Sequence, residues 1–429
     1  MTGLASFQTA ISGISGQSHA LDVIGANIAN VTTGGYKRSE TSFRTVLSDT
    51  VAYNPGNPDA PGPASTQSDL GGVRAYDSAR IGQPGEYAAT GRNLDIAVSG
   101  RGFFVLNSEP DGSGATIYGR DGQLSVANVA GASEAGVGGA QGYLVDKNGY
   151  FLQGWPAAPD GSFATGGALA SMRVDADAFA SPGAATTAAA LAMNLSADDA
   201  IGATETYTID VFDSAAKQHP VQLSFIKQTA NAWSVIASGG PATTVSITPN
   251  SGLVFDAAGQ LTSPTTYSFA ATFADDPANP TTAAFTLDLG GFTQFAGSFL
   301  AYDYERDGYA PGALSGVTFN DRGEVIGKFD NGRTRPLYRL ALADFVNPDG
   351  LAQLSGNVYA ESGTSGQPVV AGAGERGLGE ISPSTLEKSN VDLAREFTRM
   401  MLTQNAYNSS ATAFRTIDEM TEVARDLAR

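Results

Sequence analysis

Both ends of the chain carry apolar residues in alternating steps of three and four, which places these side chains along one face of an α-helix. In the first 30 residues the stripe consists of Leu4, Phe7, Ile11, Ile14, Leu21 and Ile28, with weak points at Ser18 and Gly25. In the last 40 residues it consists of Leu393, Phe397, Met400, Tyr407, Phe414, Ile417, Met420 and Leu427, with one shortened step after Phe414. A short step overwinds a coiled coil without destroying it. The two stripes together predict that residues 1–30 and 390–429 form helices that pack against each other as a coiled coil.

Each stripe taken alone is equally consistent with a surface helix docked on its own domain. The first 30 residues contain several glycines, each costing about 1 kcal/mol relative to alanine in a helix, so this helix needs packing partners. No glycine or proline interrupts residues 390–429. We expect Ser389 or Asn390 to cap this second helix, with Asp392 in its first turn.

The middle of the chain shows short alternating strands separated by turn residues, which predicts β structure. Asn148-Gly149 and Asn331-Gly332 are hairpin signals. If the two ends pair, the chain runs out and returns, so each layer combines an early and a late segment. The predicted fold class is therefore multidomain, with paired terminal helices and nested all-β domains between them. The predicted parts are a helical domain of 1–30 plus 390–429, extended connecting segments of 31–72 plus 361–389, a discontinuous β domain of 73–146 plus 305–360, and an inserted outer β domain of 147–304.

The net charge of −18 lies entirely in the middle of the chain, because the two ends are nearly neutral. Strong acidity disfavours nucleic acid and anionic membranes as partners. The absence of cysteine excludes disulfides and thiolate chemistry. No apolar run is long enough for a transmembrane helix. The N-terminus lacks the pattern of a secretory signal, so export would need a route without a cleaved signal peptide.

Motifs for catalysis, cofactors and metals are weak in this sequence. The two histidines, His19 and His219, have no neighbouring residues that mark a catalytic triad or a metal site. Residues 372–377 match the letters of a dinucleotide-binding motif, but glycine and proline follow where the motif requires a helix. We therefore expect no catalytic, cofactor-binding or metal site, and a protein that is not an enzyme.

Two strings near the ends resemble the signatures of the bacterial flagellar rod and hook protein family. Residues 21–30 (LDVIGANIAN) and 33–37 (TGGYK) resemble the N-terminal signature, and residues 389–393 (SNVDL) with 404–407 (QNAY) resemble the C-terminal one. The signature positions that we single out are Asn27, Asn30, Gly35, Tyr36, Ser389, Asn390, Val391 and Asp392. Residues 91–98, 102–105 and 307–312 extend the resemblance into the first β domain.

The resemblance implies a structural subunit of an extracellular flagellar polymer. Within the family, a length of 429 residues with an inserted β region favours a hook subunit over the shorter distal rod proteins. The implied assembly is a curved, hollow helical tube that transmits motor torque to the filament as a flexible universal joint, with the paired helices lining its inner wall. The implied partners are copies of the chain itself, the distal rod, hook cap and hook–filament junction proteins, and the flagellar type III export apparatus. The alternatives are a distal rod or other axial protein, a secreted β-rich adhesin, or a secreted hydrolase.

Overall fold

The computed structural model describes residues 2–53, 65–129, 141–176, 178–240 and 243–427. The chain forms two compact units. The first comprises Met1–Asp175, Val317–Gly327 and Arg335–Arg429, and the second comprises Ala176–Gly316 and Lys328–Thr334. The chain thus leaves the first unit and returns to it.

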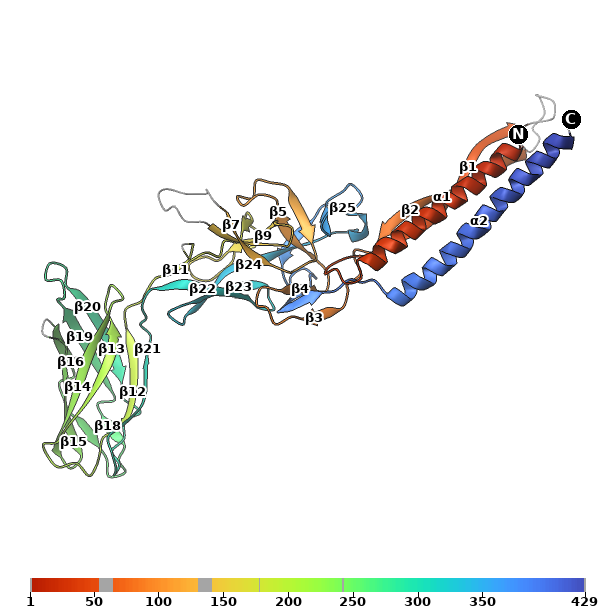
Figure 1. Cartoon of the computed structure of the whole chain (residues 1–429). Coiled ribbons are helices and arrows are strands. Elements are labelled where there is room, and N and C mark those ends of the chain that lie inside the picture. Colours follow the sequence, from red (N-terminus) through yellow and green to blue (C-terminus); the bar gives the residue numbers. More distant parts are fainter. Residues whose placement is uncertain (1, 54–64, 130–140, 177, 241–242, 428–429) are drawn as a thin grey trace. The chain divides into compact units, whose positions relative to one another are not determined.

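Two helices at the chain ends lie antiparallel in the first unit. α1 spans Thr2–Ala29 and α2 spans Leu393–Leu427. They run side by side, with both chain termini at the same end of the pair (Figure 1). Paired terminal helices with several β-sheets between them confirm the predicted fold class.

The cap of α2 differs from the expected one. Asp392, rather than Ser389 or Asn390, accepts hydrogen bonds from the helix start, with its Oδ1 atom 2.9 Å from Ala394 N. Asn390 is not available as a cap because its side chain binds the segment that follows α1, accepting a hydrogen bond from Arg38 N at 2.8 Å.

A long antiparallel hairpin covers α1 on the side away from α2. Its strands are β1 (Ser39–Tyr53) and β2 (Ser65–Ala79). A Cβ added at Gly16 of α1 would lie 3.0 Å from the Phe43 ring of β1, so the glycine permits this close contact. Ser12 Oγ accepts a hydrogen bond from Val73 N of β2 at 3.1 Å. Parts of the segment 31–72, which was expected to be an extended connection, are therefore strands paired on a helix.

The β region of the first unit pairs early strands with late ones. Its strands are β3 (Tyr87–Ala89), β4 (Ile96–Ser99), β5 (Phe103–Asn107), β6 (Thr116–Gly119), β7 (Ser125–Val129), β8 (Gln141–Val145), β9 (Phe151–Pro156), β10 (Ala170–Ser171), β24 (Thr334–Asp344), β25 (Ala352–Leu354), β26 (Val358–Ala360), β27 (Val369–Gly372), β28 (Glu380–Pro383) and β29 (Thr385–Glu387). β24 pairs with β5, β26 with β6, β28 with β4 and β29 with β3. A buried cluster that includes Phe103, Tyr118, Trp155, Phe345 and Tyr359 forms the core between these segments.

The boundary of the second unit lies later in the chain than the predicted insertion of 147–304. β9 follows residue 147 but pairs with β5 and β24, so it belongs to the first unit. β22 (Gly312–Phe319) and β23 (Glu324–Phe329) contribute residues to both units. The segment 361–389, expected to be a connection, contains β27, β28 and β29.

The second unit is built from two five-stranded sheets that share one core. The strands of these sheets are β12 (Ala188–Asn194), β13 (Thr204–Phe212), β14 (Gln218–Thr229), β15 (Ala232–Ser238), β16 (Thr243–Thr248), β17 (Leu253–Phe255), β18 (Leu261–Ser263), β19 (Thr266–Phe273), β20 (Thr281–Asp288) and β21 (Leu300–Arg306). The short strand β11 (Ala180–Ser181) lies outside them and pairs with β22. The sheets have the orders β16-β19-β20-β12-β21 and β13-β14-β15-β17-β18. Alternate residues of β14 and β19 are buried, and Phe225, Trp233, Phe269 and Phe285 meet in the core. Among the described residues, no helix is long and apolar enough to cross a membrane.

We expect the second unit to fold without the rest of the chain, because its core is contained within residues 187–307. The two ends of this segment are adjacent, since Thr187 N donates a hydrogen bond to Asp307 Oδ1 at 2.8 Å. Joining Thr186 to Gly308 through a short Gly/Ser linker should therefore leave the first unit folded with an unchanged melting temperature. The excised segment should melt cooperatively by itself.

The two tryptophans allow this experiment to follow each part separately, because Trp155 lies in the first unit and Trp233 in the second. Loss of cooperative unfolding in the shortened chain would show that the second unit is needed for the stability of the first.

Candidate functional site

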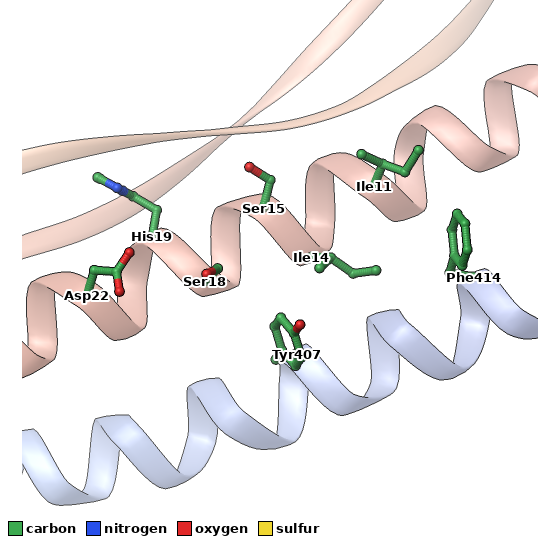
Figure 2. A pocket seen from close by; sticks show the side chains of 8 residues that line it. All are labelled: Ile11, Ile14, Ser15, Ser18, His19, Asp22, Tyr407 and Phe414. Atoms are coloured by element: carbon green, nitrogen blue, oxygen red, sulfur yellow. The ribbon is translucent and has the colours of Figure 1, made fainter.

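The contact between α1 and α2 combines aromatic packing with a close backbone approach. The rings of Phe7 and Phe414 meet edge to face, with centroids 5.3 Å apart and an interplanar angle of 72°. A Cβ added at Gly13 would lie 3.3 Å from Ser410 Oγ, so this glycine allows the helices to come close. Farther along the pair, Ile14 of α1 and Tyr407 of α2 line one groove (Figure 2).

The residues of the two predicted stripes are divided between this contact and the surface. The half-buried ones are Phe7, Ile14, Leu21, Ile28, Met400, Tyr407, Phe414 and Ile417. Ile11, Leu393, Phe397 and Met420 are exposed. The side chains of Leu4 and Leu427 lie outside the described residues. The buried positions described in α1 are instead small residues or residues outside the stripe, namely Ala10, Gly16, Ala20, Ile24 and Asn27. This shift arises because the hairpin and α2 cover α1 from two sides.

Asn27 joins three elements at the end of the helix pair where α1 ends and α2 begins, which we call the base of the helix pair. Its side chain is buried in α1 and donates hydrogen bonds to Ser39 O of β1 at 2.8 Å and to Glu396 Oε2 of α2 at 3.2 Å. Its Oδ1 atom accepts from Ser39 N at 3.0 Å and from the Tyr36 hydroxyl at 3.2 Å. An amide with two donors and an acceptor oxygen can make all four bonds. Burial, together with the nearby Glu396 carboxylate, raises the pKa of Tyr36.

Asn390 makes the corresponding links from the C-terminal signature. Besides accepting from Arg38 N, it donates from Nδ2 to Arg80 O and to Gln83 O, each at 3.1 Å. Its backbone N donates to Tyr36 O at 3.3 Å. The structure therefore brings Asn27, Tyr36 and Asn390 of the two signatures into one hydrogen-bonded network.

The other signature residues shape the chain around this network. Asn30 closes the end of α1, since its side chain donates to Ala26 O at 2.9 Å. Gly35 has a φ of +67°, and an added Cβ would lie 2.9 Å from Asp121 N. Ser389 Oγ accepts a hydrogen bond from Val391 N at 3.3 Å, just before the Asp392 cap.

A buried ionic triad lies beside the network and was not found from the sequence. Lys37 Nζ forms an ion pair with the Glu387 carboxylate, and Arg120 Nη1 lies 3.4 Å from Glu387 Oε2. The exposed fractions of the three side chains are 0%, 0% and 2% for Lys37, Glu387 and Arg120. Burial lowers the pKa of Lys37, and the Glu387 charge opposes that shift. Lys37 follows the signature tyrosine, but no local pattern links it to Glu387 or Arg120.

Glu40 forms ion pairs with three arginines from separate parts of the chain. Its carboxylate lies 2.7 Å from Arg38, from Arg80 at the end of the hairpin and from Arg399 of α2. Burial disfavours the charged carboxylate, but the hydrogen bonds from Arg399 and Arg80 and the charge of Arg38 outweigh this and lower the pKa of Glu40 to about 2. Glu40 therefore connects α2 to the hairpin electrostatically.

We expect the Glu40 carboxylate to stabilise the docking of α2 down to strongly acidic pH. A depressed folded-state pKa gives stabilisation that is fully present above the ordinary value of 4.5 and is lost as pH falls toward 2. Replacing Glu40 by Gln should lower the melting temperature at pH 7 and reduce its dependence on pH between 4.5 and 2. Melting curves of the unmodified chain and the Glu40→Gln variant across this pH range give the difference in melting temperature. Taking this difference cancels the effect of the other carboxylates, which titrate in both proteins. Parallel curves for the two proteins would contradict the assignment.

The side chains of the two histidines lie within hydrogen-bonding distance of carboxylates in the fold. His19 Nε2 lies 2.7 Å from Asp77 Oδ2 and connects α1 to the hairpin. His219 Nε2 lies 2.7 Å from Asp213 Oδ2, and its ring stacks on Phe273. Within the described ranges, no group of His, Asp and Glu side chains is arranged to hold a metal ion. Of residues 372–377, the first ends β27 and the others lie in the turn before β28.

Comparisons with known proteins cover the whole chain. Three family models match: "Flagella basal body rod protein" at residues 7–37, "Flagellar basal body protein FlaE D2 domain" at 163–309, and "Flagellar basal body rod FlgEFG protein C-terminal" at 382–427. The chain is 32% identical to the flagellar hook protein FlgE of Rhizobium meliloti (strain 1021), over 100% of both chains. It is 30% identical to the same protein of Salmonella typhimurium, over 97% of this chain and 98% of the relative. For the protein of Treponema pallidum the identity is 29%, over 99% and 100%.

Proposed function

The chain belongs to the flagellar hook protein family, and from that premise we propose that it polymerises into a curved, hollow hook that transmits torque to the filament while bending. Proteins of this family are structural subunits of the flagellum rather than enzymes. The observation that carries the proposal is the full-length match together with a pair of terminal helices that leaves apolar side chains uncovered. These exposed side chains are Ile11, Leu393, Phe397, Met401, Leu402, Met420 and Val423.

The composition of the two helices favours contacts between copies of the chain. Residues 1–18 and 400–414 contain no Asp, Glu, Lys or Arg. Uncharged surfaces can pack densely without charge repulsion, and clustered exposed apolar side chains are typical of interaction sites. We propose that the stripe residues of both helices contact neighbouring subunits along the inner wall of the tube. The β region of the first unit and the second unit would form its outer layers.

The acidic charge elsewhere in the chain favours solvated contacts that shift at low cost as the tube bends. The proposed partners at the two ends of the tube are the distal rod protein on one side and the hook cap and junction proteins on the other. Export through the flagellar type III apparatus is the proposed route to the cell exterior.

Negative-stain electron microscopy of the concentrated purified chain tests the proposal. Curved tubes with a central channel are the expected result. Straight tubes would favour a rod protein of the same family, and a protein that remains monomeric at all concentrations would contradict the proposed assembly.

A further inference from the structure

An open groove runs along the outer side of the α1/α2 contact (Figure 2). We call it the α1/α2 groove; it has a volume of about 520 Å³ and is lined from α1 by Ile11, Ile14, Ser15, Ser18, His19 and Asp22. Tyr407 and Phe414 line it from α2. The exposed fraction of Ile11 is 54%, so the apolar part of the groove is in contact with solvent in the single subunit. Asp22 places a carboxylate at the end of the groove nearest the base of the helix pair.

A ridge of matching character lies on another face of α2. It contains Arg395 and Leu402, which we call the α2 ridge, and the exposed fraction of Leu402 is 65%. Seven residues are about two helical turns, so these two side chains project in nearly the same direction. Tyr407 follows Leu402 by five residues and is therefore roughly 140° around the helix from it. Leu402 instead borders a separate cavity with Val23 and Ile24 of α1 and with β1.

The groove and the ridge each carry a charged residue and a second residue at the same axial separation, and the two charges are opposite. Asp22 and Ser15 are also seven residues apart, so the axial distance between either pair is about 10.5 Å. α1 and α2 run in opposite directions. On α1, Asp22 is therefore closer than Ser15 to the base of the helix pair, and on α2, Arg395 is closer than Leu402. A second copy in the same orientation can therefore place Arg395 beside Asp22 and Leu402 beside Ser15.

We propose that the α2 ridge of one subunit docks in the α1/α2 groove of a second copy, with Arg395 paired to Asp22 and Leu402 packed near Ser15, Ile14 and Ile11. In the part of the chain that the structure describes, neither Asp22 nor Arg395 has an ion-pair partner within the subunit, and both are exposed. Opposite charges at matched positions fix the register of an interface. This assignment rests on the proposed hook function, because it takes a second copy of the chain as the occupant.

The geometry of this contact is suited to a polymer. Groove and ridge are different surfaces, so the contact is heterologous and each subunit keeps one free groove and one free ridge. Heterologous contacts repeat from copy to copy and generate rings or open helical filaments rather than closed dimers.

A charge exchange tests the ion pair. Asp22→Arg and Arg395→Asp should each raise the critical concentration for polymerisation by about tenfold or more, since like charges then meet at the interface. The double variant restores opposite charges and should recover most of the loss. Sedimentation of polymer against monomer measures the effect, and an unchanged melting temperature of the soluble subunit separates it from misfolding. Single variants that polymerise normally, or a double variant that is no better than either single one, would overturn the docking.

Engineered cysteines give an independent test, because the chain has no cysteine of its own. In oxidised tubes, Ser15→Cys combined with Leu402→Cys should produce a ladder of covalent oligomers. Each single variant should give none. Ser15→Cys with Gln404→Cys is the matched control, because Gln404 is exposed on α2 and lies about 200° around the helix from Leu402, on the opposite face from the ridge. If the unmodified chain forms no tubes at all, the proposed hook function fails. If tubes form but the control pair crosslinks as well as the ridge pair, only the docking assignment is wrong.

Discussion

Replacing Phe414 by Asp should abolish polymerisation while the β region of the first unit and the whole second unit keep their melting temperatures. Phe414 contacts the Phe7 ring and also lines the α1/α2 groove, so the substitution affects the helix pair and its outer surface together. A carboxylate in this position would lose the edge-to-face contact and would need to be desolvated on assembly, which costs several kcal/mol for an unpaired charge. The cost recurs in every subunit of a polymer, so the effect on assembly is much larger than on a single chain.

The measurement compares sedimentable polymer and thermal unfolding for the Phe414→Asp and Phe414→Leu variants. Leu retains an apolar side chain and should polymerise with a moderately raised critical concentration. Normal tubes from the Asp variant would show that Phe414 is not part of the polymer contact. A large fall in the melting temperature of the second unit or of the β region of the first would show instead that the helix pair supports the fold of the subunit.

Replacing Glu387 by Gln should destabilise the first unit by about 3–5 kcal/mol, the range found when one partner of a buried ion pair is removed. Glu387 is the acidic member of the triad with Lys37 and Arg120, and it also accepts a hydrogen bond from Gly85 N at 2.7 Å. The variant leaves two buried cations without a counter-charge. A loss of this size corresponds to a fall in melting temperature on the order of 10 °C for a unit of this size.

Trp155 fluorescence during thermal unfolding follows the first unit, and Trp233 should report an unchanged second unit. Glu380→Gln is the matched control, because Glu380 is exposed on the adjacent strand β28 and its loss should shift the melting temperature by little. The double variant Lys37→Met with Glu387→Gln should be less destabilised than Glu387→Gln alone, since it removes one of the uncompensated charges. Equal losses for Glu387→Gln and Glu380→Gln would contradict a structural role for the triad.

The two terminal helices show what hydrophobic periodicity can and cannot predict. The three–four spacing of Phe7, Ile14, Tyr407 and Phe414 predicted two amphipathic helices, and these four residues do lie at the contact between α1 and α2. The same spacing also included Ile11 and Phe397, which are exposed in the single subunit. Periodicity reports that a face is apolar, but it does not say whether that face is covered by the same chain or by another one.

The hairpin β1–β2 shows why other features were not predicted. Its strands are polar and are separated by a proline-rich segment, which favoured the interpretation as an extended connection. The hairpin packs on α1, where Gly16 leaves space for a side chain of β1 and Ser12 accepts a hydrogen bond from β2. Because the hairpin covers one side of α1, the buried face of the helix includes Ala20 and Ile24, which lie outside the predicted stripe. A strand stabilised mainly by a partner far along the chain leaves little local signal.

Sequence alone determined the helical ends, the β-rich middle, the return of the chain and the family, because each depends on short-range periodicity, turn residues or contiguous signature strings. Only the tertiary structure decided that Asn27 meets Glu396, that Asn390 binds the segment after α1 while Asp392 caps α2, and that Lys37 shares Glu387 with Arg120. The physical reason is sequence separation. A buried charge or amide must find its partner wherever the fold places one, and the partners of Asn27, Asn390 and Lys37 lie hundreds of residues away, beyond the reach of any local pattern. The cap of α2 is a local contact, but it falls to Asp392 because Asn390 is bound by one of these distant segments.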